Sequence, residues 1–242
     1  MTRFIVLTLF EEMFDAFKNT SIIKRAIDKK LVDIKTVDIR EFSTNKHKKV
    51  DFPPYGGGSG MVMSCEPIAK AIDYSLELLN YDMKANNENK DIKIIYLSPR
   101  GKLLNYNICK ELSAKDSNYI LLCGHYEGVD ERIIEEYNIE EISIGDYVLT
   151  GGELASQVLM DSVIRLIPDV LSNGSLLEES HTNNLLEYPQ YTKPECFRGK
   201  NVPEVLRSGN HKKIEEYRKS ESIKITIKNR PDLYRKLKKE NN

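Results

Sequence analysis

The 242-residue sequence predicts an α/β protein whose sheet is largely parallel. Short apolar runs alternate with helix-like stretches along the first two thirds of the chain, and glycine-rich segments follow directly after several of these runs. Towards the end of the chain the strand-like runs stop and basic helical patterns take over. We therefore expect an α/β domain at residues 1–167, a linker at residues 168–184, and a small all-helical domain at residues 185–242.

The elements of the first domain are expected in regular alternation. Residues 4–7 and the alternating run 32–39 are typical of strands, and residues 21–30 between them have helical spacing. Ser64 is a typical N-cap, and Pro67 suits the first turn of the helix that follows it. Further strands are expected at residues 92–97, 119–123 and 141–144, with helices around residues 108–112 and from 153 to 167.

Composition indicates an ordinary soluble protein, with 40% hydrophobic and 30% charged residues. The apolar run at residues 3–10 is far shorter than a membrane span and is followed by Glu11 and Glu12, which argues against a signal peptide or a membrane helix. We expect no membrane association and a cytoplasmic location. The cysteines lie far apart without a CxxC pair, so they are expected to be reduced packing residues; they are Cys65, Cys109, Cys123 and Cys196.

The segment 198–242 is strongly basic although the whole chain carries a net charge of −1. It holds 14 Lys+Arg and 6 Asp+Glu, a balance of +8, which leaves −9 for the remainder. Such asymmetry favours contact with a polyanion, although lysines on the solvated faces of helices would give the same count. Within this segment, residues 211–219 and 223–228 are expected to form separate short helices.

Two glycine-punctuated segments, residues 123–132 and 143–153, each follow a strand-like run, and a third strand end is found at residues 96–101. Glycine lets a ligand approach the backbone and permits tight turns with positive φ. In open α/β sheets, pockets form at the carboxyl ends of adjacent strands. The three segments therefore predict one ligand pocket lined by backbone groups.

The glycine loop at residues 54–60 resembles a phosphate-binding loop at first sight. It lacks the GK[ST] of a P-loop and the GxGxxG of a dinucleotide fold, which argues against a nucleoside triphosphate. A flexible turn and a contact with a ligand or RNA remain as two interpretations.

Five segments in one order resemble a single family: YGGGSGM at 55–61, YLSPRG at 96–101, CGHYEGVDER at 123–132, SIGDYVLTGGELA at 143–155 and LEYPQYTKPE at 186–195. The family is that of the bacterial tRNA (guanine-N1)-methyltransferases, TrmD, and the resemblance spans essentially the whole chain. It implies a SPOUT-type fold with a trefoil knot, S-adenosylmethionine as methyl donor, and a homodimer with the active site at the subunit interface. It further implies methylation of tRNA guanine 37, next to the anticodon, with the basic helical domain binding the tRNA.

The resemblance also implies which residues surround the methyl donor. For the hydrophobic residues Ile144, Val148 and Leu149, the alternative is that their side chains pack in the core. Their backbone N–H and C=O groups would still be able to form hydrogen bonds with the adenine of the donor. The residues implied as donor-binding are Tyr96, Leu97, Ser98, Pro99, Gly124, Glu127, Ile144, Gly145, Asp146, Tyr147, Val148, Leu149, Gly151 and Gly152.

Glu127 is implied to lie near the donor's sulfonium and to act as a catalytic group. A carboxylate in a glycine loop can alternatively cap the helix that follows, as Asp130 and Glu131 are expected to do.

Methylation of guanine N1 needs a base for its proton and a cation for the charge that develops towards O6. The resemblance implies Glu179 as the base, where the family has aspartate, with Glu178 and Glu187 as alternatives. Arg165 is implied as the cation. The alternative is that Arg165 is an ordinary surface arginine near the end of a helix. Mg²⁺ is implied as a possible cofactor, but no carboxylate spacing indicates metal ligands.

Two other functions fit parts of the pattern. One is a SPOUT methyltransferase that acts on a different RNA nucleotide. The other is an RNA-binding protein that has lost methyl transfer, which Glu179 in place of aspartate would motivate. The intact donor segments argue against the second.

Overall fold

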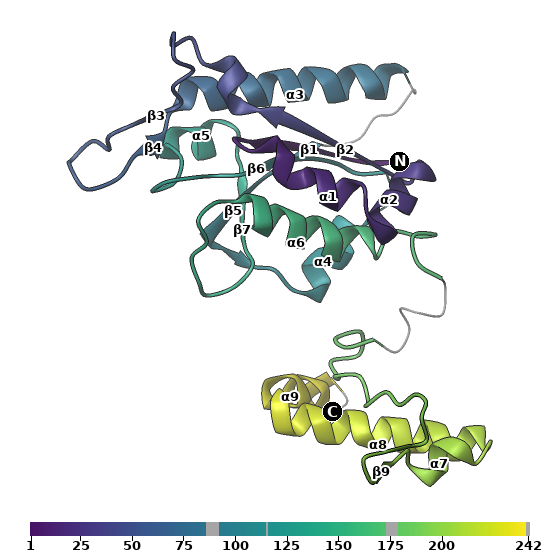
Figure 1. Cartoon of the computed structure of the whole chain (residues 1–242). Helices are drawn as coiled ribbons and strands as arrows, with labels where there is room; N and C mark the ends of the chain where they lie inside the picture. Colours follow the sequence, from purple (N-terminus) through teal and green to yellow (C-terminus); the bar gives the residue numbers. More distant parts are fainter. Residues whose placement is uncertain (86–91, 115, 173–178, 241–242) are drawn as a thin grey trace. The chain divides into compact units, whose positions relative to one another are not determined.

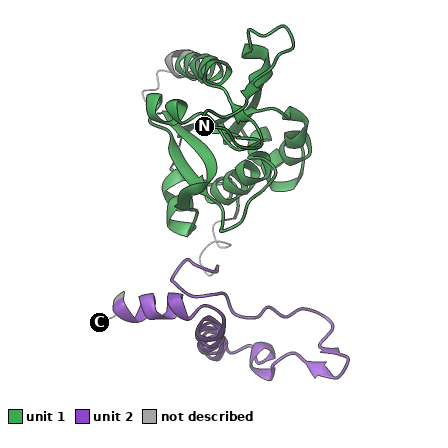
Figure 2. Ribbon diagram, turned by 90° about the vertical axis from the view of Figure 1, so that its left-hand side faces the viewer, with its two compact units in different colours: residues 1–171 green, residues 172–242 purple. Residues whose placement is uncertain are grey.

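The computed structural model describes residues 1–85, 92–114, 116–172 and 179–240. It divides into two compact units, Met1–Leu171 and Ser172–Asn242, here called unit 1 and unit 2. Figure 2 shows them in two colours. Within the described ranges, no helix combines the length and the apolarity that crossing a bilayer requires.

Unit 1 is built on a five-stranded sheet with the order β2-β1-β6-β5-β7. Its strands are β1 (Thr2–Thr8), β2 (Val32–Asp38), β5 (Ile92–Leu103), β6 (Asn118–Leu122) and β7 (Glu140–Ser143). The neighbouring strands pair in parallel. Helices lie between the strands along the chain, which confirms the α/β class with a mostly parallel sheet.

Helices cover both faces of this sheet (Figure 1). Side chains alternate along β1, so Phe4 and Val6 face one buried core while Ile5 and Leu7 face the other. The first core is completed by α2 (Ser21–Asp28), α4 (Tyr106–Leu112) and α6 (Glu153–Ile164), together with α1 (Asp15–Lys18) and the short η1 (Glu11–Phe14). The second is completed by α3 (Cys65–Ala85), α5 (Glu131–Glu136) and η2 (Ile39–Phe42).

Most expected elements of unit 1 begin and end within two residues of their predicted positions. The strand β5 is an exception, because it continues to Leu103 and its register against β7 shifts between Leu97 and Lys102. A Cβ on Gly101 would lie 2.4 Å from the Glu141 carbonyl carbon, so this bulge requires glycine. The helix expected to reach residue 167 ends as α6 at Ile164.

An antiparallel ribbon, β3 (Asp51–Phe52) with β4 (Val62–Met63), carries the glycine loop at residues 54–60 and was not expected from the sequence. The helix α3 starts directly after Ser64, whose hydroxyl donates to the Val50 carbonyl oxygen at 3.0 Å. Four side chains on its apolar face are buried against the sheet, namely Ile68, Ala71, Ile72 and Leu79.

Unit 2 contains α7 (Glu204–Arg207), α8 (His211–Asn229) and α9 (Pro231–Glu240). The expectation of purely helical structure is wrong here, because β8 (Cys196–Phe197) and β9 (Lys200–Asn201) form a short antiparallel hairpin. The expectation of separate helices at residues 211–219 and 223–228 is also wrong, since α8 runs through both. Neither glycine nor proline interrupts this stretch, and Asn210 caps its start by accepting from the Lys213 N–H at 3.2 Å.

Candidate functional site

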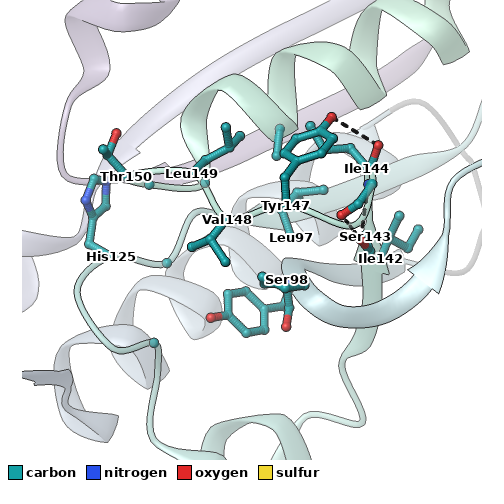
Figure 3. A pocket seen from close by; sticks show the side chains of 18 of the residues that line it. Leu97, Ser98, His125, Ile142, Ser143, Ile144, Tyr147, Val148, Leu149 and Thr150 are labelled. Carbon is teal, nitrogen blue, oxygen red and sulfur yellow. Dashed lines mark hydrogen bonds between the residues drawn. The ribbon is translucent and has the colours of Figure 1, made fainter.

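The three strand ends expected to form a pocket lie side by side at the carboxyl ends of β6, β5 and β7. They surround a cavity of about 220 Å³, shown in Figure 3. All the residues implied as donor-binding line this cavity, except Asp146. The sequence interpretation did not name seven lining residues, which are His125, Tyr126, Gly128, Ile142, Ser143, Thr150 and Ala155. Several of these stand within the glycine segments, so their position in the motif could have identified them.

Side-chain exposure separates the hydrophobic residues of the loop after β7. Ile144 packs against the core, as its alternative interpretation holds. Val148 is 81% exposed and Leu149 is 37% exposed, so core packing does not account for them. Their side chains are available to a bound molecule.

The loop after β7 is held by its own hydrogen bonds (Figure 3). The Ser143 hydroxyl lies 3.0 Å from the Gly145 carbonyl oxygen, and the Gly145 N–H donates back to that hydroxyl at 3.2 Å. The Tyr147 hydroxyl donates to the Ile144 carbonyl oxygen at 3.2 Å. These hydrogen bonds within the loop define its shape.

Glycines allow the pocket walls to pack on one another. A Cβ on Gly124 would lie 2.7 Å from the Tyr96 ring, and one on Gly152 would lie 2.7 Å from the Cys123 Cα. The Gly152 N–H donates to the Gly124 carbonyl oxygen at 2.9 Å. The sequence interpretation assigned these glycines to the approach of a ligand, whereas the structure shows that close packing within the chain already requires them.

Burial sets the protonation of two groups beside the cavity. Loss of solvent, followed by the Glu141 charge, raises the pKa of Tyr96 above its usual value. Loss of solvent and then the Glu153 charge raise the pKa of Cys123 far above the ordinary thiol value. Tyr96 therefore stays a neutral phenol, and Cys123 stays a thiol that is a poor nucleophile.

Glu127 is exposed and lines the cavity. Its N–H donates to the Met61 carbonyl oxygen at 3.0 Å. Its carboxylate packs against Gly60, where an added Cβ would lie only 2.4 Å from the carboxylate oxygen Oε1. The cap of α5 is Asp130, which accepts from the Arg132 N–H at 3.1 Å, as expected from the sequence. The capping alternative for Glu127 is therefore wrong.

The remaining predicted catalytic residues belong to different units. Arg165 is the half-buried C-cap of α6 in unit 1. Glu179 lines a cavity of about 470 Å³ within unit 2, together with Tyr188 and Arg218. Glu178 lies outside the described residues.

The segment that carries Glu179 is fastened within unit 2. The Glu187 N–H donates to the Ser180 hydroxyl at 3.0 Å, and the Leu186 N–H donates to the buried Thr226 hydroxyl of α8 at 2.8 Å. The Glu187 carboxylate accepts from the Gln190 amide at 2.5 Å. Glu179, Ser180 and Glu187 thus share one segment of the chain.

Comparison with known proteins gives consistent results along the whole chain. A sequence profile described as tRNA (guanine-1)-methyltransferase TrmD matches residues 2–236. The tRNA (guanine-N(1)-)-methyltransferase of Clostridioides difficile is 52% identical over 235 residues, which cover 97% of this chain and 98% of that protein. The proteins of the same name from Clostridium novyi and Ruminiclostridium cellulolyticum are 54% and 53% identical, covering 96% and 99% of this chain and 91% and 99% of their own lengths. The chain therefore belongs to the TrmD family of tRNA (guanine-N1)-methyltransferases.

Proposed function

We propose that this tRNA (guanine-N1)-methyltransferase takes a methyl group from S-adenosylmethionine and transfers it to N1 of guanine 37, next to the anticodon. Family membership over residues 2–236 carries the reaction class. The cavity at three adjacent strand ends supports the assignment of the donor site.

The donor site we propose is the cavity between the loops after β5, β6 and β7. Backbone N–H and C=O groups of residues 144–149 would read the adenine edge, and the exposed Val148 and Leu149 side chains would cover its faces. The Glu127 carboxylate at the cavity would face the cationic sulfonium. The neutral Tyr96 hydroxyl adds a hydrogen-bonding group without a second charge.

The chemistry we propose divides between two groups. The Glu179 carboxylate accepts the N1 proton of the guanine, and the Arg165 guanidinium stabilises the charge that moves towards O6. N1 then attacks the donor's methyl carbon while the carbon–sulfur bond breaks, which leaves S-adenosylhomocysteine and a protonated Glu179. Glutamate serves in place of the family's aspartate because it has the same functional group and one more methylene.

A homodimer with the active site at the subunit interface is part of this proposal. The outer surface of α6 and the neighbouring η1 expose Leu154, Val158 and Met13, and such a group of large apolar side chains favours burial against a second copy. The trefoil knot is proposed as well. It rests on membership of the family over residues 2–236.

Unit 2 is proposed to bind the tRNA, with residues 168–184 as the linker to the donor-binding domain. Its basic residues would contact phosphates. One of them, Arg218, lies 4.7 Å from the centre of the Tyr188 ring. The proposed phosphate contacts are Lys212, Lys213, Arg218, Lys224, Lys228 and Arg230. The cytoplasm is the proposed location, because the substrate tRNA is found there.

Magnesium is not supported by the side chains that the structure places. Within the described ranges, no group of three or more His, Cys, Asp or Glu residues is arranged to hold a metal ion. No residue is therefore assigned as a ligand of Mg²⁺.

The proposed function is tested by methyl transfer from labelled S-adenosylmethionine to two tRNA transcripts that differ only at position 37. We expect 1-methylguanosine in the guanine transcript, found by mass spectrometry of nucleosides, and no transfer to the adenine transcript. Transfer at another nucleotide would favour a SPOUT enzyme of different specificity. Binding of tRNA without any transfer would favour an RNA-binding protein.

A further inference from the structure

A buried carboxylate contacts the cavity-lining residue His125 and has no part in the proposed chemistry. Glu153, the first residue of α6, is 1% exposed. Its Oε1 accepts from the Thr8 hydroxyl at 2.6 Å, and its Oε2 lies 2.7 Å from the His125 Nε2.

The pair of Glu153 and His125, together with Thr8, joins three segments that are distant in sequence. Thr8 ends β1, and its hydroxyl also accepts from the Phe10 N–H at 2.9 Å. His125 stands in the loop after β6, where its ring meets the Phe10 ring edge-on at 5.1 Å between centroids. Glu153 follows the loop after β7 directly. The pair therefore crosses from one wall of the cavity to the other.

The same two walls also meet through the backbone beside the pair. His125 and Gly151 form an antiparallel bridge. A Cβ on Gly151 would lie 2.2 Å from the His125 ring and 2.7 Å from the Glu153 carboxylate. The space next to the Gly151 backbone is thus filled by the imidazole and the carboxylate.

We infer that His125 and Glu153 are positioning residues that hold the two glycine loops at the separation the methyl donor needs. The inference rests on the proposed function, because it takes this cavity as the donor site. A charge-assisted hydrogen bond between the loops fixes their distance before the donor arrives, so less order has to be gained on binding. The effect should therefore fall on donor affinity rather than on turnover with saturating donor.

The first test compares His125→Leu with His125→Gln in the full-length protein. Leucine keeps the bulk of the side chain but lacks a hydrogen-bond donor. The glutamine amide can still donate a hydrogen bond to Glu153 from a similar position. We expect calorimetry with S-adenosylmethionine to show a dissociation constant raised about tenfold for the leucine variant and nearly unchanged for the glutamine variant. At saturating S-adenosylmethionine, the kcat of the leucine variant should fall by a smaller factor than its affinity for S-adenosylmethionine does.

Glu153→Gln provides a second variant if the leucine protein does not fold. It keeps the volume and the acceptor for Thr8 but removes the charge, and it should raise the dissociation constant for S-adenosylmethionine above that of wild type by less than about tenfold. Thermal unfolding of each variant identifies those that fold. A folded Glu153→Gln protein with a lowered kcat and unchanged donor affinity would overturn the positioning role.

A double-mutant cycle tests the geometry independently. Gly151→Ala should weaken donor binding because its methyl group displaces the His125 ring, and it should do so less in a His125→Ala background, where that ring is absent. Equal effects in both backgrounds, or His125→Leu binding the donor as wild type does, would overturn the inference. Failure of the wild-type protein to bind S-adenosylmethionine would instead contradict the proposed function.

Discussion

Unit 1 and unit 2 differ in how firmly their side chains are packed. In unit 1 a parallel sheet carries a buried core on each face, and the loops at its strand ends are joined by hydrogen bonds and by close backbone contacts. Among the described residues of unit 2, those that are buried are Ser222, Thr226 and Leu233. The site proposed for the donor is therefore prepared in advance, while the residue proposed as the base lies in a unit with a small core.

This difference indicates a division of work between the units. Donor binding should depend on unit 1 rather than on unit 2, because all the residues that line the cavity belong to unit 1. Methyl transfer should depend on both units, since Arg165 and Glu179 belong to different ones. Changes that affect donor binding and transfer separately can test this division.

The largest effect is expected from Glu179→Gln, which removes the proposed base. The kcat for methyl transfer should fall about 10²–10⁴-fold, a typical contribution of general base catalysis. Donor affinity measured by calorimetry should stay within about twofold of wild type. The matched control is Glu187→Gln on the same segment, and a larger loss of turnover in the control would move the base to Glu187.

Gly152→Ala should damage unit 1 and the donor site together. The new methyl group would lie 2.7 Å from the Cys123 Cα, a contact with backbone that no side-chain rotation can relieve. We expect a loss of about 1–3 kcal/mol in the free energy of unfolding, measured in urea, together with weaker donor binding. Gly209→Ala in unit 2 is the control: it has a φ of +69° with open space around it, so it should lose some stability and keep donor affinity. Unchanged donor affinity in Gly152→Ala would contradict the role of this contact.

Lys212→Ala and Lys213→Ala should weaken tRNA binding and leave donor binding unchanged. Each lysine that contacts a phosphate adds about one unit to the slope of log affinity against log salt concentration. Filter binding across a salt series should therefore give a shallower slope for the double variant than for wild type. Identical slopes would exclude these lysines from the phosphate contacts.

The smallest effect is expected from Asp232→Asn in unit 2. The Arg230 guanidinium, 2.7 Å away, lowers the pKa of the Asp232 carboxyl from 3.8 to about 2. Because the folded pKa is the lower one, this pair stabilises the protein above pH 4 and loses that contribution as the pH falls towards 2. The effect is small since both side chains are exposed to solvent. Thermal melts should show the wild type losing slightly more stability than the variant over this range, and parallel curves would contradict the assignment.

The sequence predicted the parts of the molecule that depend on local patterns. Short apolar runs, and in one case an alternating run, located the strands, and the glycine segments located the cavity at their ends. The pairing of His125 with Glu153 could not be predicted, because it arises only when the loops after β6 and β7 pack together. The continuation of β5 to Leu103 depends on a bulge against β7, and no spacing in the sequence signals it. The roles of Glu179 and Arg165 stay predictions, because they come from the family resemblance.

The short hairpin of unit 2 offers a natural site for labelling. Cys196 in β8 is exposed, whereas Cys109 and Cys123 are buried and Cys65 is partly covered. Burial is also the largest cause of the raised pKa of the thiols of Cys65, Cys109 and Cys123, which makes them slow to react with maleimides. A fluorophore added to the unaltered protein should therefore attach mainly to the hairpin. Its emission anisotropy would then test, without any engineered cysteine, the proposal that tRNA binds unit 2.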